Sequence, residues 1–212
     1  FKRSQKYIIK MKKVGIINCS INNLFSIRNV IQLLGFDTII SNDIKQLKKS
    51  DYLILPGVGA FAEAKKRILE NELDIFIKNF IKKGNLFLGI CLGFQLMFEK
   101  SVEFEDCEGL NLVKGEIKPL KDSAKIVPHV GWNKVASLKK NLIKDSESKF
   151  YFIHSYYAKT SSSKDILFKS KYYDLEFCSG INKDNIYGFQ FHPEKSGKNG
   201  FNLLNTLFKT FN

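Results

Sequence analysis

Residues 86–98 read LFLGICLGFQLMF and contain the pattern that decides the expected fold. The apolar run at 86–90 has the composition of a strand buried on both faces of a sheet. It leads through a G-x-C-x-G stretch at 89–93 into a segment that suits a helix. Glycines on both sides of a cysteine at such a junction permit a sharp, strained turn that lifts the thiol above the end of the strand. Cys91 is therefore a candidate nucleophile, with a buried structural cysteine as the alternative.

Strand-like and helical segments alternate in the chain that leads up to this turn. Short apolar runs at 14–17, 36–40 and 52–55 alternate with helical spacing at 22–34 and 61–81. This alternation predicts an α/β fold with an open, mostly parallel sheet covered by helices on both faces. Ligands of such sheets bind beyond the carboxyl ends of the strands. A site is therefore expected near residues 18–23, 56–60 and 91.

The second half of the chain has a different character. After about residue 109, turn signals separate strand-like runs at 112–119, 132–136, 150–156, 166–169, 176–181 and 187–191. These runs are expected to extend the sheet with antiparallel strands, and helical spacing returns at 200–211. We expect one domain over residues 11–212. Residues 1–10, which precede the first methionine, are expected to be an N-terminal extension or an artificial remnant.

Composition excludes several classes of protein. The 34 basic and 21 acidic residues give a net charge of +13, but nearly all the basic residues are lysines scattered along the chain. Nucleic-acid recognition favours clustered arginine, so no nucleic-acid partner is predicted. The four cysteines are far apart and show no C-x-x-C spacing, which argues against a metal site or a disulfide framework. No apolar run approaches the ~20 residues of a membrane span, so a cytoplasmic protein is expected.

A general base for Cys91 can be selected from three histidines, His129, His154 and His192. Pro193 biases His192 toward an extended conformation, in which side chains two residues apart share a face. Glu194 can then fix the tautomer of His192 while the other ring nitrogen serves Cys91. A polar turn at the end of a strand is the alternative. The cysteine turn favours the catalytic interpretation.

The stretch PGVG at 56–59 follows a predicted strand and should lie at the same sheet edge as Cys91. Acyl transfer develops an oxyanion, which backbone N–H groups stabilise. Glycines allow a peptide plane to face such a charge or to turn away from it. An ordinary turn is the alternative, because Pro-Gly is common in turns.

Together, several stretches resemble the class I glutamine amidotransferases: PGVGAF at 56–61, GICLGFQ at 89–95, HVGWN at 129–133, HSY at 154–156 and FQFHPEKSG at 189–197. The cysteine turn and His-Pro-Glu resemble the family in general. The stretch PHVGWN at 128–133 is similar to the glutaminase subunits of imidazole glycerol phosphate synthases. The resemblance covers about residues 12–211 and implies a flavodoxin-like α/β fold with a single glutaminase domain.

The resemblance also implies roles for individual residues. Cys91 would be the nucleophile, His192 the general base and acid, and Glu194 its orienting partner. The N–H groups of Val58 and Leu92 would form an oxyanion hole. Residues expected to bind the substrate glutamine are Gly59, Gln95, Glu103, His154, Ser155 and Tyr156. Trp132 and Asn22 are expected at a partner interface.

The implied activity is hydrolysis of glutamine to glutamate and ammonia through a glutamyl thioester, with no metal and no organic cofactor. By resemblance, the ammonia passes within a heterodimeric lyase complex to a (β/α)8-barrel cyclase subunit. That subunit makes imidazole glycerol phosphate and aminoimidazole carboxamide ribotide in histidine biosynthesis.

Three alternatives stay open. Family members usually carry an Asp-Tyr-Gly-x-Gly-Asn-like loop after the first strand, whereas residues 18–23 read NCSINN. This departure is compatible with a paralogous subunit that supplies ammonia to a surface-sugar biosynthetic enzyme. A non-catalytic scaffold would be expected to lose Cys91 or His192, and both are present. A cysteine hydrolase acting on another substrate would need neither Gln95 nor the loop at 57–59.

Overall fold

The computed structural model describes residues 11–19, 24–103, 106–122, 124–139, 142–143, 145 and 147–211. The expected extension at 1–10 lies outside the described residues, as does Asn22. None of the helices in these ranges is long and apolar enough to span a membrane.

Parallel strands form one half of the main sheet, with β2 at its edge. Their order is β2 (Asp37–Ser41), β1 (Lys13–Ile17), β3 (Tyr52–Leu55), β4 (Phe87–Ile90) and β14 (Ile186–Phe189). The helices between the first four strands are α1 (Leu24–Leu33), α2 (Ile44–Leu47), α3 (Phe61–Glu70) and α4 (Leu73–Lys82). Parallel neighbours need such crossover connections. The predicted α/β fold with a mostly parallel sheet is confirmed.

The second half adds antiparallel strands to β14, but the turn-rich pattern predicted them only in part. The run expected at 187–191 was wrong in direction, because β14 pairs in parallel with β4. The runs expected at 132–136 and 150–156 do not extend this sheet and pair with each other instead. Next to β14 come β13 (Leu175–Lys183), β11 (Tyr156–Thr160) and β7 (Gly115–Pro119). The seven-residue β12 (Ile166–Tyr172) pairs with β13. The shorter elements around them are β5 (Lys100–Ser101), β6 (Cys107–Glu108), β9 (Ala136–Ser137), η1 (Leu120–Asp122) and η2 (Ser163–Asp165). A separate antiparallel pair consists of β8 (His129–Lys134) and β10 (Lys149–His154).

Two predicted elements are divided in the structure. The helix expected at 61–81 breaks between α3 and α4, where Glu72 adopts the left-handed conformation with φ 54°. Asn71 is the C-cap of α3, and its side-chain amide and its backbone N–H both donate to the carbonyl of Arg67. The strand expected at 150–156 breaks at Ser155, so β10 and β11 belong to different sheets. Helical and alternating patterns do not reveal such changes of direction.

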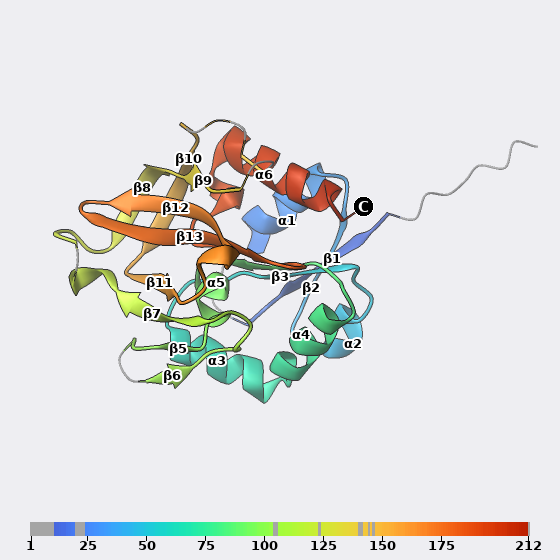
Figure 1. Cartoon of the computed structure of the whole chain (residues 1–212). Helices are drawn as coiled ribbons and strands as arrows, with labels where there is room; N and C mark the ends of the chain where they lie inside the picture. Colours follow the sequence, from blue (N-terminus) through green and yellow to red (C-terminus); the bar gives the residue numbers. More distant parts are fainter. Residues whose placement is uncertain are drawn as a thin grey trace, which may run out of the picture.

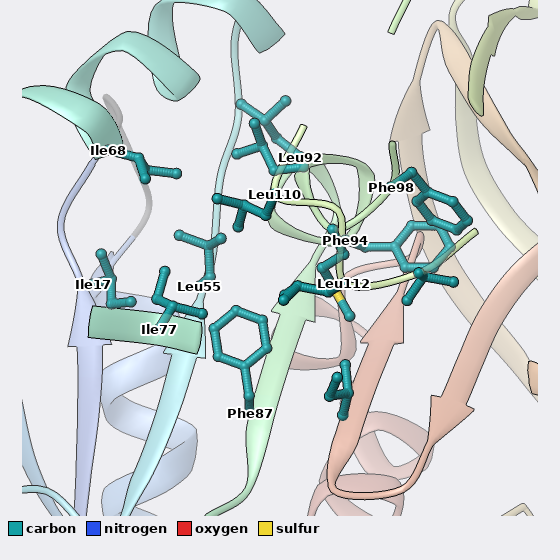
Figure 2. Packing of buried hydrophobic residues seen from close by; sticks show 14 of the residues in the cluster. Ile17, Leu55, Ile68, Ile77, Phe87, Leu92, Phe94, Phe98, Leu110 and Leu112 are labelled. Atoms are coloured by element: carbon teal, nitrogen blue, oxygen red, sulfur yellow. The ribbon is translucent and has the colours of Figure 1, made fainter. Parts of the chain in front are cut away.

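Two layers of helices cover the main sheet, because successive residues of a strand point to opposite faces. Leu55 of β3 lies in one apolar cluster with α3 and α4, whereas its neighbour Ile54 lies in the other with α1 and α6 (Gly197–Lys209). Figure 1 shows these helix pairs on opposite faces of the sheet. Figure 2 shows residues of the first cluster, including Ile17, Leu55, Ile68, Ile77 and Phe87. This packing fixes the strand ends at which the candidate site lies.

Candidate active site

Cys91 occupies a tight turn between β4 and α5 (Leu92–Leu96). Its backbone angles, φ 53° and ψ −107°, lie in a region that non-glycine residues rarely adopt. The flanking glycines are needed for close chain approach. A Cβ at Gly93 would lie 1.7 Å from the carbonyl oxygen of Leu55, and one at Gly89 would lie 2.8 Å from that of Gly93. The local sequence therefore permits the strained turn that holds Cys91 at the end of β4.

His192 and Glu194 form a buried pair at the start of η3 (Pro193–Lys195). His192 Nδ1 lies 2.7 Å from Glu194 Oε1, and their side chains are 4% and 2% exposed. A backbone hydrogen bond of 2.9 Å from His192 N to the carbonyl of Tyr151 fixes the segment against β10. Within the described residues, His192 Nε2 has no hydrogen-bond partner. Nδ1 is thus occupied by Glu194, while Nε2 stays available for proton transfer.

The electrostatic surroundings favour a protonated His192. Burial lowers its pKa, but interactions with Cys91 and with Glu194 outweigh burial and raise the pKa to about 10. A raised pKa means that the imidazolium is favoured by its neighbours. The arrangement therefore couples Cys91 to a histidine that holds a proton ready for a leaving group.

A cavity of about 500 Å³ opens beside Cys91. It is lined by Val58, Gly59, Cys91, Leu92, Gln95, Glu103, Pro128, Ile153, His154, Ser155 and Tyr156. Every residue predicted to bind glutamine, and both predicted oxyanion residues, lie in this lining. His192 and Glu194 do not line it and instead border a void of about 20 Å³ under the loop at 56–58. A larger cavity of about 790 Å³ between α2 and α4 contains none of the predicted residues, so its size alone does not indicate function.

Two polar side chains that line the cavity are held by hydrogen bonds to the protein. Glu103 Oε2 accepts a hydrogen bond of 2.8 Å from the N–H of Phe61 at the start of α3. Burial raises the pKa of Glu103, and the Phe61 N–H offsets this only in part. Gln95 Nε2 donates to the carbonyl of Tyr156 at 3.0 Å and to Gln190 Oε1 at 3.1 Å. Both side chains are therefore fixed before any ligand arrives.

The residue that sequence reasoning missed is Gln190. It is fully buried, its Nε2 lies 3.9 Å from Cys91 Sγ, and its Oε1 accepts from Gln95. Gln190 is a polar residue between two phenylalanines, two positions before His192. An amide in so apolar a segment was the available signal, because buried polar groups need a specific partner.

The two predicted oxyanion donors do not converge in this structure. The Leu92 N–H donates to the carbonyl of Gly57 at 3.3 Å. The peptide bond between Gly57 and Val58 is trans, so the Val58 N–H points in the opposite direction to the Gly57 carbonyl. Because that carbonyl faces the Leu92 N–H, the Val58 N–H points away from it. Gly57 must be small here, because a Cβ would lie 2.9 Å from Leu92 Cβ. Formation of the predicted oxyanion hole requires this peptide plane to turn over.

The predicted interface residue Trp132 lies on an exposed apolar strip of the β8–β10 pair. Trp132 is 55% exposed, Val130 on the same strand 53%, and Ile153, which pairs with Val130, 41%. Exposed apolar groups gathered in this way are typical of interaction surfaces. The other predicted interface residue, Asn22, lies outside the described residues.

This chain is similar to known proteins over most of its length. The family model described as glutamine amidotransferase class-I matches residues 14–210. The imidazole glycerol phosphate synthase subunit HisH of Sulfurimonas denitrificans is 40% identical over 203 residues, which cover 92% of this chain and 97% of the relative. The subunit of the same name from Caldanaerobacter subterraneus subsp. tengcongensis is 42% identical over 196 residues, covering 90% and 95%.

Solved structures share the fold at low sequence identity. A structure of PurLQS from Thermotoga maritima matches with a TM-score of 0.74 and 14% identity, covering 95% of this chain and all of that one. A crystal structure of a glutamine amidotransferase matches with a TM-score of 0.73 and 14% identity, covering 92% and 97%. These similarities concern the fold.

Proposed function

This chain belongs to the class I glutamine amidotransferases, and within them to the HisH subunits of imidazole glycerol phosphate synthase, and we propose that Cys91, His192 and Glu194 carry its glutaminase chemistry. The cavity of about 500 Å³ is the observation that carries this proposal, because it brings Cys91 together with all the residues predicted to hold glutamine. The supporting test is release of glutamate and ammonia from glutamine by the chain together with its synthase partner.

In the proposed reaction, the Cys91 thiolate attacks the side-chain carbonyl carbon of glutamine. His192 donates its proton to the departing ammonia, and a glutamyl thioester remains on Cys91. His192, now neutral, takes a proton from water, which attacks the thioester and releases glutamate. Glu194 holds the ring through Nδ1 in both steps, at the 2.7 Å distance found here.

The partner follows from the family. We propose a heterodimer with a barrel-fold cyclase subunit that receives the ammonia and makes imidazole glycerol phosphate. The exposed strip with Val130, Trp132 and Ile153 is the surface we assign to this partner. The relatives reported above are HisH subunits, which favours this partner over a surface-sugar enzyme. Cysteines that carry thiols rather than disulfides support a reducing, cytoplasmic setting.

Glutaminase activity is expected to depend on the partner, because the Val58 N–H faces away from the Leu92 N–H in the isolated chain. One oxyanion donor contributes about 3 kcal/mol to transition-state stabilisation, so turning the 57–58 peptide should accelerate hydrolysis roughly a hundredfold. Val58→Pro removes the N–H and is expected to abolish the stimulation while complex formation persists. The measurement is a glutaminase assay with and without the cyclase subunit and its nucleotide.

Val58→Ala is the matched control, since it shortens the same side chain and keeps the N–H; it should retain the stimulation. Full activity in the isolated wild-type chain would contradict this switch. Unchanged stimulation in a folded Val58→Pro variant would do the same.

Trp132→Ala is expected to weaken association with the cyclase subunit by about tenfold or more, because exposed tryptophans at interfaces often dominate binding energy. Ile75→Ala is the control. Ile75 is 60% exposed on α4, beside the cavity between α2 and α4. Titration calorimetry of both variants against the partner measures the difference. Equal affinities would place the interface elsewhere.

A further inference from the structure

A chain of hydrogen bonds joins the β8–β10 pair to Gln95 in the candidate active site. Asn133 Nδ2 lies 3.4 Å from His129 Nε2, and His129 Nδ1 lies 2.9 Å from His154 Nε2. His154 Nδ1 in turn lies 2.7 Å from the carbonyl oxygen of Tyr156, to which Gln95 Nε2 also donates at 3.0 Å. The proposed reaction uses neither His129 nor its contact with His154. His129, and the contact it makes with the cavity residue His154, therefore lack an assigned role.

The carbonyl of Tyr156 determines the direction of this chain, because a carbonyl oxygen only accepts. His154 Nδ1 must carry the hydrogen. Burial, together with the nearby His129, lowers the pKa of His154 to about 3, so the ring is neutral and its Nε2 accepts. Burial also lowers the pKa of His129 to about 4. The neutral His129 therefore donates from Nδ1 to His154 and accepts from Asn133 at Nε2.

Packing holds both rings in these positions. The His129 ring stacks on Tyr172 with centroids 3.9 Å apart and on Phe152 at 4.8 Å. His154 packs against Phe177 at 5.4 Å. The two histidines are 3% and 6% exposed. Neither ring can turn over without moving its aromatic neighbours.

The same contacts fix the orientation of the Gln95 amide. Its Nε2 donates to two oxygens, the carbonyl of Tyr156 and Oε1 of Gln190. An amide turned by 180° would place Gln95 Oε1 against both of these oxygens, which is repulsive. Oε1 is left as an acceptor in the cavity that Gln95 lines. The site therefore presents an oxygen, and not an N–H, at this position.

We propose that the His129–His154 pair is a positioning element that holds the Tyr156 carbonyl, and through it the Gln95 amide, so that Gln95 accepts a hydrogen bond from an N–H of the substrate. This inference rests on the proposed function. His129 fixes the tautomer of His154, and His154 fixes the carbonyl. Because Asn133 and His129 belong to β8, the strand that bears Trp132, the element also connects the proposed partner surface with the glutamine pocket.

The test compares His154→Leu with His154→Asn in the complex with the cyclase subunit. In asparagine, Nδ2 takes the place of histidine Nδ1 and can donate to the Tyr156 carbonyl, whereas leucine cannot. Loss of a buried hydrogen bond should raise KM for glutamine about tenfold in His154→Leu, with kcat changed less. His154→Asn should stay within about threefold of wild type. Glutamine binding to the same variants in a Cys91→Ala background, measured by calorimetry, should follow the same order.

If His154 only stabilised the fold, KM for glutamine would rise more in His154→Asn than in His154→Leu. Asparagine would bury an unpaired carbonyl oxygen, whereas leucine fills the space better. Thermal unfolding of both variants therefore separates the two roles. For a positioning role, the His154→Leu variant should unfold at the same or a higher temperature than His154→Asn and still bind glutamine more weakly. If His154→Leu fails to fold, His129→Leu provides the test, with an expected rise in KM of about threefold from loss of tautomer control.

Two outcomes overturn the inference in distinguishable ways. If the wild-type complex hydrolyses glutamine and His154→Leu has the wild-type KM, the positioning role is wrong and the proposed function stands. If the wild-type complex neither hydrolyses nor binds glutamine, the proposed function is wrong and this inference falls with it.

Discussion

Replacement of Cys91 by alanine is expected to abolish glutamine hydrolysis by the complex, with a loss of at least about a thousandfold. The thiolate is the only group proposed to form a bond with the substrate, and Gln190, its polar neighbour at 3.9 Å, has no nucleophilic atom. Folding should be preserved, because alanine is smaller than cysteine and therefore fits the packed turn in which Cys91 is only 5% exposed. The measurement is ammonia release in the presence of the cyclase subunit and its nucleotide. Activity above a few per cent of wild type would contradict the assignment.

Chemical labelling gives an independent check on the nucleophile. A diazo-ketone analogue of glutamine should modify Cys91 and leave Cys19, Cys107 and Cys178 unmodified. Burial raises the pKa of Cys178 to about 12, which keeps that thiol protonated. Cys107→Ala is the matched control for the alanine substitution, because Cys107 lies in β6, outside the cavity lining. It should retain activity. Mass mapping of the label to another cysteine would show that the nucleophile is not Cys91.

The sequence was sufficient to predict the parts of this protein that depend on local pattern. Apolar runs and helical spacing predicted the parallel strands up to β4, and the glycines around Cys91 predicted its turn. The prediction of one helix over 61–81 was wrong in one respect. The helical spacing of apolar residues is the same before and after Asn71 and Glu72, but the backbone changes direction at these two residues. Periodicity reports which residues are buried, but not whether one helix or two bury them.

The polar interior of the site was less accessible to sequence reasoning. Gln95, Glu103 and His154 were expected near the substrate only by resemblance, and the cavity lining is consistent with that expectation. The link from His129 to Gln95 joins residues far apart in the chain, so no local pattern indicates it. The orientation of the 57–58 peptide was equally out of reach, because a Gly-Val-Gly segment permits both orientations of its peptide planes.

Loss of His192 is expected to cost about a thousandfold or more in kcat/KM, and loss of Glu194 less, because the base transfers the proton and the acid only orients it. Glu194 Oε1 holds His192 Nδ1 at 2.7 Å and helps to raise the pKa of the histidine, against the effect of burial. Glu194→Gln should therefore lower that pKa. Steady-state assays of His192→Ala, Glu194→Gln and His154→Ala in the complex rank the three positions.

The pH dependence of Glu194→Gln separates orientation from general damage to the site. In wild type, the protonated His192 that donates to ammonia is present below its raised pKa of about 10 and is lost above it. With the Glu194 charge removed, that loss should begin at lower pH, so the alkaline limb of the kcat/KM profile should move toward neutrality. An unmoved alkaline limb would mean that Glu194 does not tune His192. Both ring nitrogens of His154 are occupied, Nδ1 by the Tyr156 carbonyl and Nε2 by His129, so His154→Ala should lower kcat less than His192→Ala does. The reverse order would show that His192 is not the general base.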